Sequence, residues 1–279
     1  MNKQNTFALR YGCCVNMITH TENVSGIDVI PVLKELGFDY ADLSLSHLCA
    51  LDEATFSNVQ SELLGFGLPL EACNNFFPGD LRLTGHEVNK DLIVTYLNKA
   101  FKRAAALGVK VIVFGSGLAR MVPQGFSMSQ ASSQLDDLLV ILDKYAKQYD
   151  ITIAIEPLRK QECNIVNIYS EALILARTAN SANIGCLLDS FHLNTENENI
   201  SVIQNDIEKL AHVHFAEQVG RVFPRLENKQ TYKKFFSHLK EVGYCQRLSI
   251  EAYSENYIYD AKRALKLLKD IENELNHEL

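Results

Sequence analysis

Short, nearly continuous apolar runs recur along the chain, and each is followed by a longer stretch of helical periodicity. Eight such runs begin at Phe7, Tyr40, Pro69, Val109, Ile151, Asn183, Leu210 and Arg247. Runs of this kind are typical of strands that are buried on both faces of a parallel sheet. Their spacing leaves room for a helix and two loops between successive strands.

The segments between the runs have the period of amphipathic helices. Residues 87–107 and 258–275 show it most clearly, since apolar side chains recur there every three or four positions. Gly37, Gly108 and Gly243 each stand just before the next apolar run, where helix C-termini favour glycine.

Strand–helix alternation repeated eight times predicts a single (β/α)8 TIM barrel domain spanning residues 1–279. The sixth helix, expected around residues 202–210, is the weakest of the set. An open, doubly wound sheet is the competing interpretation, but no GxGxxG motif follows the first predicted strand.

Composition and charge narrow the classes of partner. Of the 279 residues, 47% are hydrophobic and 22% are charged, which is ordinary for a globular protein with a sizeable core. The net charge of −7 disfavours nucleic acid as a partner, because an acidic surface repels phosphates. We expect no membrane span and no signal peptide, and seven scattered cysteines without a CxxC pair favour a cytoplasmic location.

Four successive predicted strands end in a carboxylate or an imidazole. Glu156 ends the fifth, Asp189 the sixth and Glu251 the eighth, while the seventh carries His212 and His214. Active sites of TIM barrels lie at the carboxyl ends of the strands. Carboxylates within apolar runs are costly to bury unpaired, and a shared divalent cation would remove that cost. Three carboxylates and one imidazole suit Mn²⁺, Mg²⁺ or Co²⁺ and also accept Zn²⁺.

Each of these residues alone also has a structural explanation. A strand-end glutamate can pair with a basic residue, an aspartate can cap the next helix, and a histidine can be hydrogen-bonded in the core. The joint occurrence at consecutive strands favours a metal site. His212 and His214 are two positions apart and face the same side of a strand, so His214, nearer the rim, is the preferred ligand.

The stretches ITIAIEPLRKQECNIVN, NIGCLLDSFHLN, HVHFAEQVGR and SIEAY resemble the sugar isomerase/epimerase superfamily with its xylose-isomerase-like barrel. Within it they are most similar to ketose 3-epimerases and hydroxypyruvate-isomerase-like enzymes. The resemblance implies that Glu156, Asp189, His214 and Glu251 bind one divalent metal ion, with Mn²⁺ favoured. It also implies that Glu156 and Glu251 form the acid/base pair on opposite faces of the substrate.

Three further residues match positions that hold substrate oxygens in the epimerases: Glu162, His192 and Arg221. One extra residue separates Arg221 from His214 here, so the resemblance supports its role least directly. The resemblance also leads us to expect a homo-oligomer, a dimer or a tetramer, formed through the outer helices. The expected substrate is a small sugar, with or without a phosphate group.

Such a site would move a proton next to a carbonyl through an enediolate, which a divalent cation stabilises. Return of the proton to the same carbon gives an epimer, and return to the neighbouring carbon gives an isomer. A metal-dependent sugar or cyclitol dehydratase is an alternative on the same barrel. An endonuclease IV-type nuclease is less favoured, because it needs extra histidines where Asn75 and Gly115 stand. A non-catalytic sugar-binding barrel would be expected to lack one of the four ligands.

Overall fold

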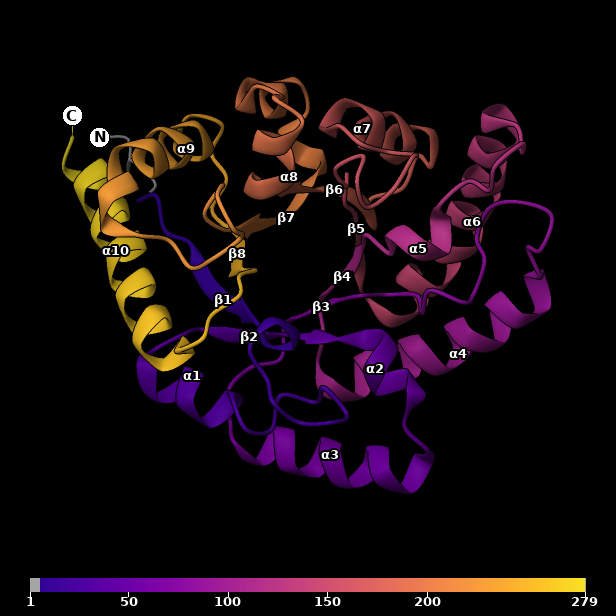
Figure 1. Ribbon diagram of the computed structural model, residues 1–279, viewed down its shortest axis with the longest axis horizontal. Coiled ribbons are helices and arrows are strands. Elements are labelled where there is room, and N and C mark those ends of the chain that lie inside the picture. Colours follow the sequence, from indigo (N-terminus) through magenta and orange to yellow (C-terminus); the bar gives the residue numbers. More distant parts are fainter. Residues whose placement is uncertain (1–5, 279) are drawn as a thin grey trace.

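The computed structural model describes residues 6–278 and contains a closed barrel of eight parallel strands surrounded by helices (Figure 1). The strands pair in chain order and β8 closes on β1, which confirms the predicted TIM barrel. Each predicted apolar run supplies one strand. The strands are β1 (Arg10–Cys14), β2 (Tyr40–Ser44), β3 (Ala72–Asn74), β4 (Val111–Phe114), β5 (Thr152–Ile155), β6 (Ile184–Asp189), β7 (Leu210–Phe215) and β8 (Arg247–Ile250).

The helices follow the strands around the barrel. They are α1 (Ile30–Leu36), α2 (Leu45–Ala50), α3 (Glu53–Gly65), α4 (Lys90–Leu107), α5 (Gly117–Arg120), α6 (Met128–Tyr149), α7 (Tyr169–Thr178), α8 (Ser190–Thr195), α9 (Lys229–Glu241) and α10 (Tyr257–His277). Helices α4 and α10 occupy the two segments with the clearest helical period. Gly108 ends α4 with a left-handed φ of 86°, as its position predicted.

The prediction for the sixth helix was wrong. Residues 200–209 form two 3₁₀ turns, η2 (Ile200–Asn205) and η3 (Ile207–Lys209), and the α-helix of this unit is the short α8 directly after β6. Asp189 explains this early start, because its side chain accepts hydrogen bonds from the backbone N–H groups of Phe191 and His192. The residues after α8, 196–199 (ENEN), are all polar and offer no apolar stripe to continue the helix.

The barrel interior changes from apolar to polar along its axis. The larger apolar core fills the space between strands and helices. A smaller apolar cluster fills the inside of the barrel; this apolar plug consists of Tyr40, Ala72, Val111, Val113, Ala154 and Leu187. Toward the carboxyl ends of the strands, the inward-facing side chains become carboxylates and imidazoles. The apolar plug therefore forms the floor of a polar layer that opens toward the rim.

A shift of register between β6 and β7 sets the direction of the histidines. Leu210 pairs with Cys186, but His212 pairs with Leu187, so β7 carries one extra residue at this point. A bulge reverses the alternation of side chains along a strand. As a result Leu210 faces the outer core, whereas His212 and His214 point into the barrel.

None of the described helices is long and apolar enough to cross a membrane.

Candidate metal and active site

Four side chains predicted from the sequence converge at the carboxyl ends of β5 to β8. Glu156, Asp189, His214 and Glu251 each place one donor atom so that all four atoms lie within 4.8 Å of one another. All four residues of this group, the rim cluster, are buried. Consecutive strands of a closed parallel barrel end at one rim, and this geometry brings together residues that are far apart in the sequence.

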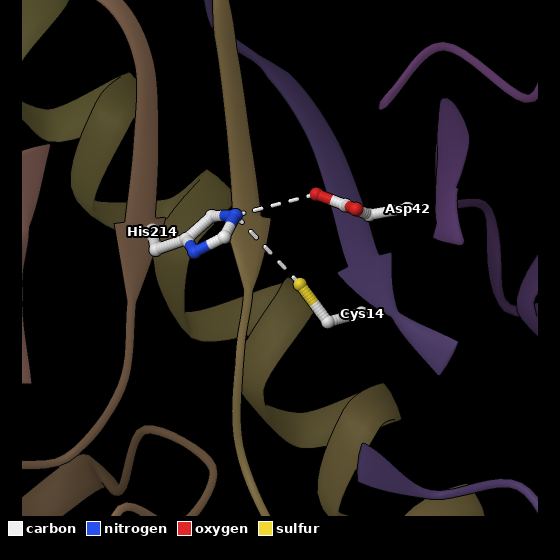
Figure 2. A group of neighbouring side chains, drawn as sticks. All are labelled: Cys14, Asp42 and His214. Carbon is white, nitrogen blue, oxygen red and sulfur yellow. Dashed lines mark hydrogen bonds and ion pairs between the residues drawn. The ribbon is translucent and has the colours of Figure 1, made fainter. Parts of the chain in front are cut away.

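His214 stands between two groups of side chains. Its Nδ1 atom lies 2.9 Å from Glu251 Oε2 and 3.4 Å from Glu156 Oε1. Its Nε2 atom points the other way, toward Asp42 Oδ2 at 3.3 Å and Cys14 Sγ at 3.8 Å (Figure 2). The ring thus connects the rim cluster to a second, deeper group.

Asp189 combines the two roles that the sequence left open. Its Oδ1 accepts hydrogen bonds from the N–H groups of Phe191 and His192 at 2.6 and 3.1 Å and so caps α8. Its Oδ2 faces the rim cluster, 3.3 Å from Arg221. The cap holds the carboxylate in one orientation and directs Oδ2, which accepts a hydrogen bond from Arg221, into the cluster.

Glu156 depends on the absence of a side chain at Gly115. A Cβ atom built on Gly115 would lie 2.2 Å from Glu156 Oε2, which is closer than any normal contact. The backbone N–H of Glu156 donates to Phe114 O, which anchors the residue to the end of β4. Glycine at the end of β4 therefore makes the space that the Glu156 carboxylate occupies.

The environments of the two glutamates push their pKa values in opposite directions. Burial raises the pKa of Glu156, and the negative charge of Glu251 adds to this. Burial alone would also raise the pKa of Glu251, but the Arg221 guanidinium and His214 hold it well below its usual range. Burial raises the pKa of Asp189 to about 6. Neighbouring carboxylates with separated pKa values are characteristic of acid/base sites.

The predicted substrate-binding residues lie beside the four-residue cluster. His192 Nδ1 accepts the backbone N–H of Arg159 at 3.2 Å, so in the neutral ring the proton is on Nε2. His192 Nε2 is 3.8 Å from Asp189 Oδ2 and has no hydrogen-bond partner. Glu162 lies farther out, paired with Arg159 at 2.6 Å and 3.9 Å from Arg221.

Arg221 reaches two members of the cluster from an unusual backbone conformation. Its φ of 48° is left-handed, which is uncommon for a residue with a side chain and often marks a functional position. The backbone is held by the N–H of Tyr253, which donates to Arg221 O at 2.8 Å. The guanidinium contacts Glu251 and Asp189 and lies over the ring of Phe191.

Unsatisfied polar atoms gather at this site. Within residues 6–278, the buried side-chain atoms without a hydrogen-bond partner include Glu156 Oε1, His192 Nε2 and Arg221 Nε. Buried polar atoms are normally paired, so such a group points to a ligand. An acceptor oxygen within a set of three carboxylates and one imidazole fits a hard divalent cation, and two N–H groups beside it fit substrate oxygens.

Asp42 and Cys14 are part of this region and were not predicted. Together with His214 they form a second group whose donor atoms lie within 4.8 Å of one another. Asp42 stands in the middle of an apolar strand rather than at its end, so a search of strand ends misses it. The signal was nevertheless present, because an aspartate inside YADLSL is as costly to bury as the one inside CLLDSF.

A family model described as a xylose isomerase-like TIM barrel matches residues 30–271. The chain belongs to this family. The match covers the strands that carry all four cluster residues, and it confirms the resemblance inferred from the sequence.

The relatives of this xylose isomerase-like barrel are isomerases and epimerases of small carbohydrates. It is 25% identical over 274 residues to inosose isomerase of Halalkalibacterium halodurans, covering 92% of this chain and 93% of the relative. It is 23% identical over 231 residues to L-ribulose 3-epimerase of Mesorhizobium japonicum, covering 81% and 74%. Its fold is similar to that of D-allulose 3-epimerase from Methylomonas sp., with a TM-score of 0.79 at 20% identity over 94% of this chain and 97% of that one.

Proposed function

We propose that the protein is a divalent-metal-dependent isomerase or epimerase of a small sugar, with chemistry of the ketose 3-epimerase type. The observation that carries the proposal is the buried cluster of Glu156, Asp189, His214 and Glu251, in which the two glutamates have pKa values shifted apart. The similarity to inosose isomerase and to ketose 3-epimerases supports a carbonyl-bearing polyol as the substrate class.

The four cluster residues would hold the cation, and their oxygen and imidazole donors suit Mn²⁺, Mg²⁺ or Co²⁺ and also accept Zn²⁺. A cation bound there would stabilise the negative charge that develops on an enediolate. His192 Nε2 and the Arg221 guanidinium are placed to donate hydrogen bonds to oxygens of the substrate. Glu162 is placed to accept a hydrogen bond from a more distant hydroxyl.

The glutamates carry the proton transfer. Glu251 stays ionised beside Arg221 and is suited to remove a proton from the carbon next to the carbonyl. Glu156, the other carboxyl group of the pair, would deliver a proton of its own from the opposite face. Return to the same carbon inverts its configuration, and return to the neighbouring carbon moves the carbonyl. Elimination of a hydroxyl from the same enediolate would make the protein a dehydratase.

A substrate panel tests the proposal. The metal-stripped protein and the Mn²⁺-restored protein are incubated with free ketoses, aldoses, inososes and hydroxypyruvate, and the products are followed by NMR. We expect a new epimer or isomer with at least one substrate, formed only after metal is restored. A product that has lost water would instead assign a dehydratase. No conversion of any compound by protein with bound metal would contradict the proposal for these unphosphorylated substrates.

Arg221→Ala is expected to raise KM by about 10- to 100-fold, because a charged hydrogen bond contributes about 1.5–3 kcal/mol. The bound metal content should change much less, since Arg221 donates to carboxylates and is not itself a metal ligand. The measurements are steady-state kinetics and metal content per chain. Arg225→Ala is the control, because Arg225 lies on the same loop, is exposed and makes no contact with the cluster. Unchanged kinetics for Arg221→Ala would remove this residue from the site.

Gly115→Ala is expected to lower kcat by about 100-fold, because misplacing a reacting group by about 1 Å costs on that order. The added methyl group would occupy the place of Glu156 Oε2 and force the carboxylate to move. Gly65→Ala is the matched control, since no heavy atom lies within 4 Å of the Cβ it adds. Steady-state kinetics measure the effect of displacing the carboxylate, and thermal unfolding shows whether the variant is generally destabilised. Equal activities of the two variants would show that the position of Glu156 is not critical.

A further inference from the structure

Asp42 forms the centre of a buried polar network beneath the rim cluster. It lies on β2 and has no exposed surface. Its Oδ2 atom is 3.0 Å from Ser249 Oγ, 3.3 Å from His214 Nε2 and 3.4 Å from His212 Nε2. The Tyr40 hydroxyl joins the network through Ser249 at 2.9 Å. A buried carboxylate is stabilised by hydrogen-bond donors, and here all of these contacts converge on Oδ2, whereas Oδ1 has no hydrogen-bond partner.

The two ring nitrogens of His214 face different partners. Nδ1 faces the carboxylates of Glu156 and Glu251, whereas Nε2 faces Asp42. A neutral imidazole carries one N–H donor and one lone pair. At 2.9 Å from Glu251 Oε2, Nδ1 donates a hydrogen bond as long as no cation is bound. A bound cation would take the place of that Nδ1 proton, and His214 would then donate from Nε2 to Asp42 and present its Nδ1 lone pair to the cation. Metal-bound histidines commonly donate their other N–H to a carboxylate, which fixes both tautomer and ring orientation.

We propose that Asp42 is a positioning residue, which holds His214 as the Nε2-protonated tautomer so that Nδ1 binds the divalent cation. The proposal rests on the metal site of the proposed function. Asp42 itself does not touch the substrate, because His214 and the carboxylates stand between it and the rim. Its contribution is to the affinity of the site for metal and, through that, to turnover.

The neighbouring group of Cys14, Asp42 and His214 could be taken for a metal site of its own (Figure 2). The side chains of Asp42 and His214 are 0% and 1% exposed, and Cys14 is also completely buried. An ion held there would have to bind His214 through Nε2 and would be separated from any substrate. The four-residue cluster uses Nδ1 instead. The two arrangements therefore require opposite nitrogens of the same ring, which makes them distinguishable.

Asp42→Asn tests the proposal. The amide has nearly the same size but no charge, and it can turn an N–H group toward His214 Nε2. We expect the affinity for Mn²⁺, measured by competition with a fluorescent chelator, to fall by about 10- to 100-fold, as for other residues that orient a metal ligand. Cys14→Ala is the matched control, since Cys14 contacts the same nitrogen and is equally buried. The Mn²⁺ affinity of the Cys14→Ala variant should stay near that of the unsubstituted protein. Unchanged affinity in Asp42→Asn would overturn the proposal.

A second measurement needs no variant of Asp42. In the Zn²⁺-loaded full chain with ¹⁵N-labelled histidine, His214 should show a proton coupled to Nε2 and none on Nδ1. A His214→Gln variant assigns the resonances. Metal bound through Nε2, or a thiolate-to-metal absorption band after Co²⁺ loading, would overturn the proposal in favour of the Cys14 group. Protein that binds no divalent cation would contradict the proposed function as well, whereas binding that is indifferent to Asp42 would contradict this inference alone.

Discussion

Glu156→Gln and Glu251→Gln are each expected to lower kcat/KM by about 10³-fold or more, since general acid–base catalysis contributes about 10²–10⁴-fold and each variant also loses a charged metal ligand. Glutamine keeps the shape of the side chain but cannot take up the proton. The two variants should differ in bound metal. Glu251 lies closer to His214 Nδ1, at 2.9 Å against 3.4 Å for Glu156. Glu251→Gln should therefore bind less metal than Glu156→Gln.

Steady-state kinetics at saturating Mn²⁺, with thermal unfolding to verify the fold, check this prediction. Glu217→Gln is the matched control. Glu217 is a buried carboxylate that follows β7 at the same rim, and its partners are Tyr232 and Asn228 rather than the cluster. It should retain nearly full turnover. Near-normal activity in Glu156→Gln or Glu251→Gln would contradict the two-base mechanism.

Removal of the metal is expected to abolish turnover, and Mn²⁺ should restore it. Bound metal should also stabilise the fold, because it neutralises three buried carboxylates. At 100 times its dissociation constant, a ligand that binds only the folded state contributes about 2.7 kcal/mol. For a chain of 279 residues that corresponds to a rise in Tm of about 5 °C. Differential scanning calorimetry of the metal-stripped and the Mn²⁺-restored protein measures this difference in Tm.

Asp189→Asn provides a controlled loss of one ligand. Asparagine caps helices as well as aspartate does, so the start of α8 should be preserved while the charged oxygen that faces the cluster is lost. The rise in Tm on adding Mn²⁺ should shrink in this variant. Full activity of the stripped protein, or an undiminished rise in Asp189→Asn, would contradict a metal centre at these residues.

The eight strands were predictable because strands buried on both faces must be apolar along their length. That constraint is local, so it is visible in each segment separately. Once the strands are ordered in a barrel, their carboxyl ends must meet, and Glu156, Asp189, His214 and Glu251 are brought together without knowledge of any side-chain contact. The roles of these residues in binding metal and moving protons remain predictions for the experiments above.

Features that depend on pairing between strands were not predictable in the same way. The extra residue in β7 is a property of its register against β6, and it turns His212 and His214 inward. Asp42 becomes important only because β2 and β7 face each other across the barrel interior. The prediction of a helix near residues 202–210 was wrong for a different reason. Asp189 starts α8 directly after β6, so only 3₁₀ turns remain before β7.

The most direct test of the proposed mechanism is proton exchange with solvent. The Mn²⁺-restored protein is incubated in D₂O with the substrate that the panel identifies, and deuterium is located by NMR. The two-base mechanism predicts metal-dependent uptake of deuterium at a single carbon next to the carbonyl, together with the new epimer or isomer. Conversion of substrate without any deuterium uptake at that carbon, or uptake that persists after the metal is stripped, would contradict it.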